Sequence, residues 1–243
     1  MRPVLLAAMV LLPCLGTGGA AEPAPAGAPA VIPAPADSAA LHLARGRRCL
    51  KTRDHAQAIT ELRQAIRLAP GSAEAHDLLG LAYSFRLQTG KAIEEIERAI
   101  ALDPDNGTYF LHLGKQHMLL MDQAAAEAAY LRAIELGLDR EMPFYDLGVI
   151  SERSNRPAEA REFYEKAVAA LPGFARGYLR LGMILEREGN EKRAFELYTA
   201  ALERDPGLTA AHYRLAQLYL REGREVLAGI HLERFRALKK TQP

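Results

Sequence analysis

Histidine, cysteine and carboxylate side chains are the groups in this sequence that could bind a metal or do acid–base chemistry. The chain has seven His, but His42, His76 and His212 share one slot of a repeating helical pattern, where we expect them to pack. His112 and His117 are five residues apart on one predicted helix, so they point in different directions. No HExxH, GxSxG, GxGxxG or P-loop motif is present. We therefore predict that the protein is not an enzyme and has no catalytic, cofactor-binding or metal site.

The two cysteines, Cys14 and Cys49, are too few for a disulfide framework. Cys14 lies in a predicted targeting segment, and Cys49 cannot form an intramolecular disulfide by itself. The absence of CxxC and CxxCH excludes a zinc ribbon and a c-type haem. We expect Cys49 to be a buried helix residue.

The charge balance argues against a nucleic-acid partner. Lys and Arg total 31, and Asp and Glu total 30. Removal of residues 1–21 takes away Arg2 and no acidic residue, so the mature balance is 30 to 30. A neutral chain has no overall attraction for nucleic acid or anionic lipid.

Residues 1–21 have the composition of a secretory signal peptide. A basic start at Arg2 precedes nine apolar residues (4–12), and small residues follow. Nine residues are too few to span a bilayer, which needs about 20. We therefore predict no transmembrane segment in the mature chain. The Ala- and Arg-rich composition and the style of the signal indicate export into a bacterial envelope, to a periplasmic or outer-membrane-associated location.

Two alternatives to soluble export stay open at this end of the chain. Cys14 could carry a lipid anchor, although Pro13 stands where bacterial lipoprotein signals have a small residue, or the segment could stay unprocessed. Residues 22–38 are rich in Ala and Pro, which favours extended polyproline II and predicts a semi-rigid linker. This linker is either a tether or an ordinary connection between signal and domain.

An internal repeat of constant length organises the rest of the chain. The dipeptide Leu-Gly recurs at 79–80, 113–114, 147–148 and 181–182. Small Ala residues recur at the same spacing in two further series, at Ala58, Ala92, Ala126, Ala160, Ala194 and Ala228 and at Ala65, Ala99, Ala133, Ala167 and Ala201. Each unit has the pattern of two amphipathic helices joined by a polar or Gly-bearing turn. Small residues at fixed slots let the helix backbones approach closely.

This pattern resembles the tetratricopeptide repeat (TPR) family, whose unit is about 34 residues long. The second unit carries its residues as His76, Leu79, Gly80, Tyr83, Ala92, Ile96 and Pro104. The fourth carries them as Phe144, Leu147, Gly148, Ala160, Tyr164 and Pro172. The resemblance covers residues 39–240 as six units that start near 39, 73, 107, 141, 175 and 209. It implies an all-α fold, a right-handed α-solenoid of about six tandem helix-turn-helix units of this length.

The two ends of the predicted solenoid depart from the pattern. Arg45 and Cys49 replace apolar residues in the first unit, as suits a terminal repeat with one face in water. Phe235 replaces the small Ala in the last unit, and no capping helix follows before Pro243. The last helix is therefore either an ordinary C-terminal helix or a contact surface for self-association.

The resemblance also implies a concave groove lined by the first helix of each unit, with a protein or peptide as its partner. Large apolar residues flanked by Arg and Lys suit a peptide with apolar anchors and some acidic groups. The alternative is that they fill the inner wall of the solenoid. The predicted binding residues are Arg47, Lys51, Leu81, Phe85, Lys115, Met118, Leu119, Tyr145, Val149, Arg153, Met183, Arg187 and Tyr213.

A more specific binding mode of the family, a clamp around a C-terminal carboxylate, is incomplete here. Arg176 and Arg180 match one half of it. The other half has Leu111 and Lys115, with Asp146 where the clamp has Asn. Binding of a chaperone tail is therefore not supported.

From the sequence we expect an exported, non-catalytic scaffold that binds a protein or peptide, in the assembly of a cell-envelope complex. Six TPR units behind a short signal are similar in architecture to the pilotin lipoproteins that help secretins of type IV pili assemble in the outer membrane. That is one alternative. Another is a regulatory subunit of an envelope enzyme complex, whose catalytic chain is a separate protein.

Overall fold

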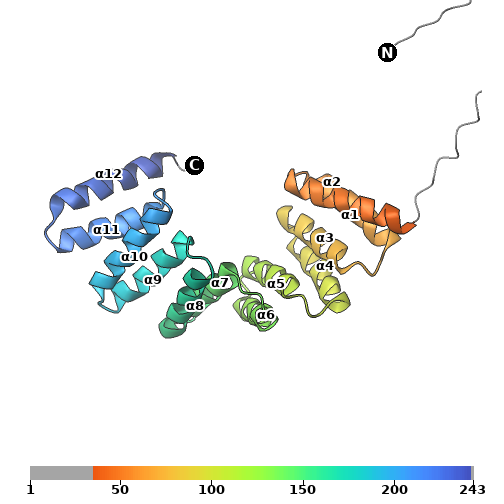
Figure 1. The fold of residues 1–243 in the computed structure, drawn as a ribbon, viewed down its shortest axis with the longest axis horizontal. Coiled ribbons are helices and arrows are strands. Elements are labelled where there is room, and N and C mark those ends of the chain that lie inside the picture. Colours follow the sequence, from red (N-terminus) through yellow and green to blue (C-terminus); the bar gives the residue numbers. More distant parts are fainter. Residues whose placement is uncertain (1–34, 242–243) are drawn as a thin grey trace, which may run out of the picture. The chain divides into compact units, whose positions relative to one another are not determined.

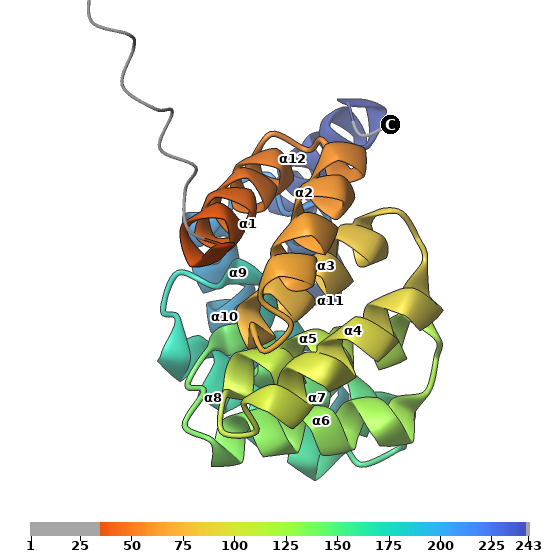
Figure 2. The same ribbon diagram turned by 90° about the vertical axis from the view of Figure 1, so that its right-hand side faces the viewer.

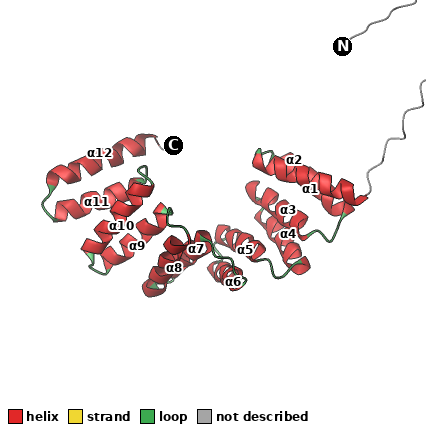
Figure 3. Cartoon of the chain, in the orientation of Figure 1, coloured by secondary structure: helices red, strands yellow, loops and turns green. Residues whose placement is uncertain are grey.

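The computed structural model describes residues 35–241, and these residues form twelve α-helices and no strand (Figure 3). The predicted signal segment, Cys14 and most of the predicted linker lie outside the described residues. The helices are α1 (Pro35–Lys51), α2 (His55–Leu68), α3 (Ala73–Phe85), α4 (Thr89–Leu102), α5 (Gly107–Leu119), α6 (Gln123–Glu135), α7 (Glu141–Arg153), α8 (Pro157–Ala170), α9 (Ala175–Arg187), α10 (Glu191–Arg204), α11 (Thr209–Arg221) and α12 (Glu225–Thr241). None of these helices is long and apolar enough to cross a membrane.

The helices pack as six consecutive pairs. Each odd-numbered helix packs on the helix that follows it, and the second helix of each pair also contacts the first helix of the next (Figure 1). The axes of successive pairs are rotated relative to one another (Figure 2). This arrangement confirms the predicted α-solenoid. α1 begins at Pro35, ahead of the start near residue 39 that the sequence pattern predicts for the first unit.

The turn within each pair is short and has one residue in the left-handed region. In the last two pairs this residue is Gly189 (φ 82°) or Gly223 (φ 72°), which adopt this conformation without strain. Leu87 (φ 58°) and Met121 (φ 59°) hold the same position in the second and third pairs, at a cost of roughly 1 kcal/mol each. In several pairs the residue just before the second helix also caps it; Asp122, for example, accepts a hydrogen bond from the Ala125 amide.

A glycine in each of the first five odd-numbered helices lies directly against a large side chain of the helix that follows. A Cβ atom at Gly148 would lie 2.5 Å from Cε1 of Tyr164, closer than real Cβ contacts come. Tyr164 is fully buried, so its ring has no free space into which it could move. The same packing recurs at Gly114 on Tyr130, Gly182 on Tyr198, Gly80 on Ile96 and Gly46 on Leu62. The Gly slot of the repeat is therefore what makes room for a large side chain between the two helices of a pair.

The last helix departs from the earlier units at two positions of the repeat. Partly buried Ile100, Ile134 and Leu202 of earlier pairs pack against the core at a seam position that recurs once in each unit, and Arg236 occupies this position in α12. Phe235 replaces the small Ala of the pattern and packs on Tyr213, with 5.3 Å between ring centroids. Self-association through α12 remains a prediction.

Replacement of Gly148 by Ala should destabilise the fold by about 1–3 kcal/mol, because the new Cβ atom overpacks the Tyr164 ring. Gly229 is the matched control, since it lies within a helix and has nothing within 4 Å of its Cβ position. Gly229→Ala should stabilise the protein by up to about 1 kcal/mol through helix propensity. Urea unfolding of the two variants measures both effects. Equal stability of the two would contradict the packing role of Gly148.

Candidate partner-binding groove

A hollow of about 570 Å³ opens between α3, α5 and α7, the first helices of the second, third and fourth pairs. Its apolar lining is Leu81, Phe85, Met118, Leu119 and Met142. Its polar lining includes His112, Lys115, Gln116, Tyr130 and Asp146. Five of these residues, Leu81, Phe85, Lys115, Met118 and Leu119, are among those predicted from the sequence.

Helical spacing brings these side chains to one side of each helix. Leu81 and Phe85 lie one helical turn apart on α3, as do Lys115 and Leu119 on α5, so each couple faces the same way. Phe85 is the last residue of α3 and is exposed, and its ring stacks on His55 with 4.7 Å between centroids. The hollow therefore has an apolar rim where the helices end.

Several polar groups of the hollow have hydrogen-bond partners. His112 Nδ1 lies 2.7 Å from Asp77 Oδ1, and the Tyr130 hydroxyl donates to Asp146 Oδ2 at 2.9 Å. Burial raises the pKa of Asp146, while the Tyr130 hydrogen bond and nearby Lys115 oppose this shift. Gln116 is buried, and its side-chain oxygen has no hydrogen-bond partner within the described part of the chain. These groups shape the wall more than they form a reactive cluster.

Toward the C-terminus, the same inner face is covered by ion pairs. The Tyr164 hydroxyl donates to Glu152 at 2.7 Å, and Arg180 and Arg187 also donate to this carboxylate. The same arrangement of one glutamate with a tyrosine and two arginines repeats in the next pair. There Glu186 accepts from the Tyr198 hydroxyl at 2.7 Å and pairs with Arg214 and Arg221. Burial raises the pKa of Tyr164 and of Tyr198, so both hydroxyls stay protonated donors.

The remaining predicted residues are spread along the inner face. Arg47 pairs with Glu74, Arg187 pairs with Glu152, and Lys51 is exposed. Tyr213 is exposed and packs on Phe235. Arg153 is exposed and has a long contact, 4.0 Å, with the Met121 sulfur.

Three predicted residues pack into the core of the C-terminal pairs. These are Tyr145, Val149 and Met183. The Tyr145 ring lies 5.6 Å from that of Tyr164 and 5.2 Å from that of Phe174, so it contributes to the inner wall. Three further residues that line the hollow, Met142, Gln116 and Tyr130, were not predicted from the sequence pattern. Met142 occupies the slot that Arg176 holds in the next pair, which is the signal that could have found it.

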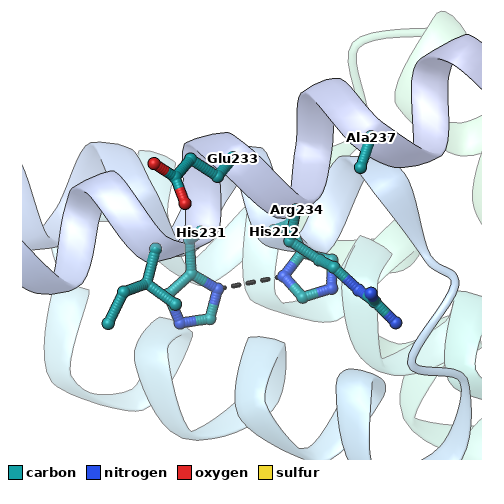
Figure 4. Close-up of a pocket in the computed structure, with 6 residues that line it drawn as sticks. His212, His231, Glu233, Arg234 and Ala237 are labelled. Carbon is teal, nitrogen blue, oxygen red and sulfur yellow. Dashed lines mark hydrogen bonds between the residues drawn. The ribbon is translucent and has the colours of Figure 1, made fainter.

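A second hollow of about 480 Å³ lies beside α12, where His212 and His231 face each other (Figure 4). Their Nδ1 atoms are 3.0 Å apart, and His212 Nε2 lies 3.1 Å from the Pro206 carbonyl oxygen. Because Nε2 of His212 donates to that carbonyl, neutral His212 accepts at Nδ1 and His231 donates. In the first two pairs the same slots hold His42 with Glu61 and His76 with Glu95, each at 2.7 Å.

The chain is an all-helical repeat protein, and family models identify which kind. Models described as tetratricopeptide repeat match residues 43–84 and 145–209, residues 73–106 and residues 185–234. The chain therefore belongs to the tetratricopeptide repeat family. No curated protein sequence matches it.

Solved structures of TPR proteins share the fold. PilF of Pseudomonas aeruginosa is 20% identical with a TM-score of 0.76, over 86% of this chain and 99% of PilF. PilW, described as a type IV pilus biogenesis factor, is 16% identical with a TM-score of 0.70, over 82% of this chain and 92% of PilW. YrrB, described as a TPR protein with an unusual peptide-binding site, is 21% identical with a TM-score of 0.61, over 74% of this chain and 92% of YrrB.

Asp146→Asn should stabilise the protein at neutral pH but not in acid. The folded state raises the pKa of Asp146, so its ionisation costs stability, and this cost grows as pH rises from the ordinary pKa of about 4 to the raised value. Asn cannot ionise, yet its side-chain oxygen still accepts from Tyr130. Urea midpoints of both proteins should agree below about pH 4 and separate as pH rises, with the variant more stable. A less stable variant at pH 7 would show that the carboxylate is needed for folding.

His231→Glu should make α12 less sensitive to acid. Burial and nearby His212 lower the pKa of His231, so folding favours its neutral form and stability falls as pH drops below the ordinary value of about 6.5. The other charged or titratable groups around this ring are Tyr219, Glu203, Glu233 and Arg234. A glutamate would restore the His–Glu pair of the first two pairs. The protection of α12 amides against hydrogen exchange should then fall less between pH 7 and pH 5 in the variant than in the wild type. An equal or larger fall in the variant would contradict the prediction.

Proposed function

We propose that this protein is a non-catalytic scaffold that binds a protein or peptide in the groove between α3, α5 and α7, in the assembly of a cell-envelope complex. The observation that carries this proposal is the apolar hollow with Phe85 and Leu119 exposed at its rim. Apolar side chains of a partner could enter the hollow, while the two exposed residues would be covered. A few such buried anchors supply most of the binding energy in protein interfaces.

The polar side chains of the groove support a binding role over a catalytic one. His112 is held by Asp77, and Asp146 by Tyr130. Glu152 and Glu186 are held by tyrosine and arginine side chains. These pairs fix the shape of the wall and present few polar groups to a substrate. The description of YrrB, whose fold is similar, refers to a peptide-binding site.

The envelope location rests on the predicted signal segment, residues 1–21, together with the similarity to PilF and PilW. A pilotin-like outer-membrane lipoprotein for secretin or type IV pilus assembly is the second candidate, favoured by the match over 99% of PilF. It requires acylation at Cys14. A regulatory subunit of an envelope enzyme complex would use the same groove with a catalytic partner.

The test compares two double variants of the full-length protein. Phe85→Ala with Leu119→Ala removes the exposed rim of the groove, and Val226→Ala with Ile230→Ala removes exposed apolar residues of α12 as a matched control. Loss of two anchors should weaken partner binding about a hundredfold or more, whereas the control should bind normally. Both variants should unfold at the wild-type temperature, since the four side chains are exposed. Binding is measured by capture from the native envelope.

A partner retained by the groove variant and lost by the control would move the interface to α12 and overturn the proposal. The mass of the captured, mature chain separates the two envelope candidates. An acylated N-terminal cysteine would indicate the pilotin-like lipoprotein. A chain that begins near residue 21 or 22 would indicate a soluble periplasmic scaffold.

A further inference from the structure

The repeat places an arginine at the end of α7, α9 and α11, and two of these three have an ion-pair partner. Arg187 pairs with Glu152, and Arg221 pairs with Glu186, in each case at the end of the preceding odd-numbered helix. The residue in the corresponding position for Arg153 is Met118. Among the described residues, Arg153 therefore has no carboxylate within ion-pair distance, and its contact is the Met121 sulfur at 4.0 Å.

The hydrogen bond of the buried tyrosine differs in the same way between these pairs. Tyr164 and Tyr198 donate to a glutamate of their own helix pair, which also binds the arginine. Tyr130 has no glutamate in its own pair to which it could donate, because Met118 occupies that position. The Tyr130 hydroxyl donates instead to Asp146 of the next pair at 2.9 Å. The tyrosine hydroxyl therefore has an acceptor in all three pairs, but Arg153 has no glutamate like the one that binds Arg187 or Arg221.

Exposed apolar side chains gather at the same edge of the groove. Their exposed fractions are 60% for Phe85, 83% for Leu87, 57% for Leu119, 54% for Leu120 and 70% for Met121. We call these five residues the turn rim. Leu87 and Met121 also hold the left-handed position that the fifth and sixth pairs fill with glycine. Folding gains little from large apolar residues that are both strained and exposed, so the turn rim is suited to burial against a partner.

Charge at this edge favours an acidic partner. Arg86 lies in the turn beside Leu87 and is exposed, and Arg153 contacts the turn rim at Met121. The nearby carboxylates have other roles: Asp122 caps α6 by accepting from the Ala125 amide, and Asp146 accepts from Tyr130. The edge is thus apolar, and neither Arg86 nor Arg153 has an ion-pair partner among the described residues.

We propose that the turn rim and Arg153 bind a segment of a partner protein that carries apolar side chains and at least one carboxylate. The apolar side chains cover the turn rim and enter the adjoining hollow. The carboxylate takes the place that Glu152 and Glu186 hold in the following pairs and forms the ion pair with Arg153. This inference rests on the proposed function and assigns the partner's carboxylate to Arg153 and its apolar side chains to the turn rim. The recessed hollow, about 570 Å³, suits side chains better than the flat surface of a bilayer.

The test selects peptides from a random dodecapeptide display library on the full-length protein. Peptides selected on the wild type should be enriched in apolar residues together with Asp or Glu. Met118→Glu supplies the missing anion within the chain, so it should remove the acidic enrichment while apolar enrichment persists. Binding of a selected acidic peptide should weaken about three- to tenfold in this variant.

Arg153→Gln provides a second variant, because Arg153 is exposed and its replacement does not disturb the core. Arg153→Gln should weaken binding of the acidic peptide as much as Met118→Glu does. Binding of a peptide in which Gln replaces the acidic residue should not change. Arg187→Gln is the matched control, since Arg187 already has Glu152 and should contribute little. A larger loss in Arg187→Gln than in Arg153→Gln would overturn the inference.

Three other results would also overturn it. Selected peptides without acidic enrichment would leave the groove as a binding site and remove the role of Arg153, so the proposed function would survive. Selection of no peptide on the wild type would contradict both. Sedimentation with phosphatidylglycerol vesicles that is lost on Leu87→Ser and Met121→Ser would show that the turn rim meets lipid.

Discussion

The contact between a glycine of the first helix and a large side chain of the second is the constraint on which the rest of this structure depends. At Gly148 the backbone of α7 rests directly on Tyr164, with no room for a Cβ atom. The contact sets the distance between the two helices of a pair. It also carries the tyrosine hydroxyl through the pair to the inner face, where the hydroxyl donates to Glu152. The packing of the glycine on the tyrosine thus places a hydrogen-bonded polar group on the inner face.

This polar feature divides the inner face into two regions. In the C-terminal pairs, Glu152 and Glu186 each accept from one tyrosine and pair with two arginines, so each of these charged side chains has a partner of opposite charge. Around α5 and α7, Met118 breaks the series, and the hollow opens beside it. A surface whose charges are already paired has little to offer a partner, whereas one with exposed apolar groups and an unpaired cation does. The two regions have one fold and differ at a few positions.

Membership of the TPR family accounts for the fold but leaves the function to the residues of the groove, because repeat proteins of one architecture bind different partners. The similarity to PilF and PilW concerns the helical framework at 20% and 16% identity. What distinguishes this chain is local: the turn rim with its two strained residues, Leu87 and Met121, and the arginine beside it. These features carry the proposals made above.

The sequence by itself determined the helix pairs and the Gly slot, because these follow from short-range patterns that recur along the repeat. It also placed Phe85, Met118 and Leu119 on the groove, since residues at one slot face the same way in every pair. The tertiary structure decided which of these side chains are free. Tyr145 and Met183 occupy groove slots yet pack against the core, because the neighbouring helix brings large side chains onto them. Arg153 and Arg187 look alike in sequence, and their difference depends on a residue of the preceding helix pair, whose approach is set by three-dimensional packing.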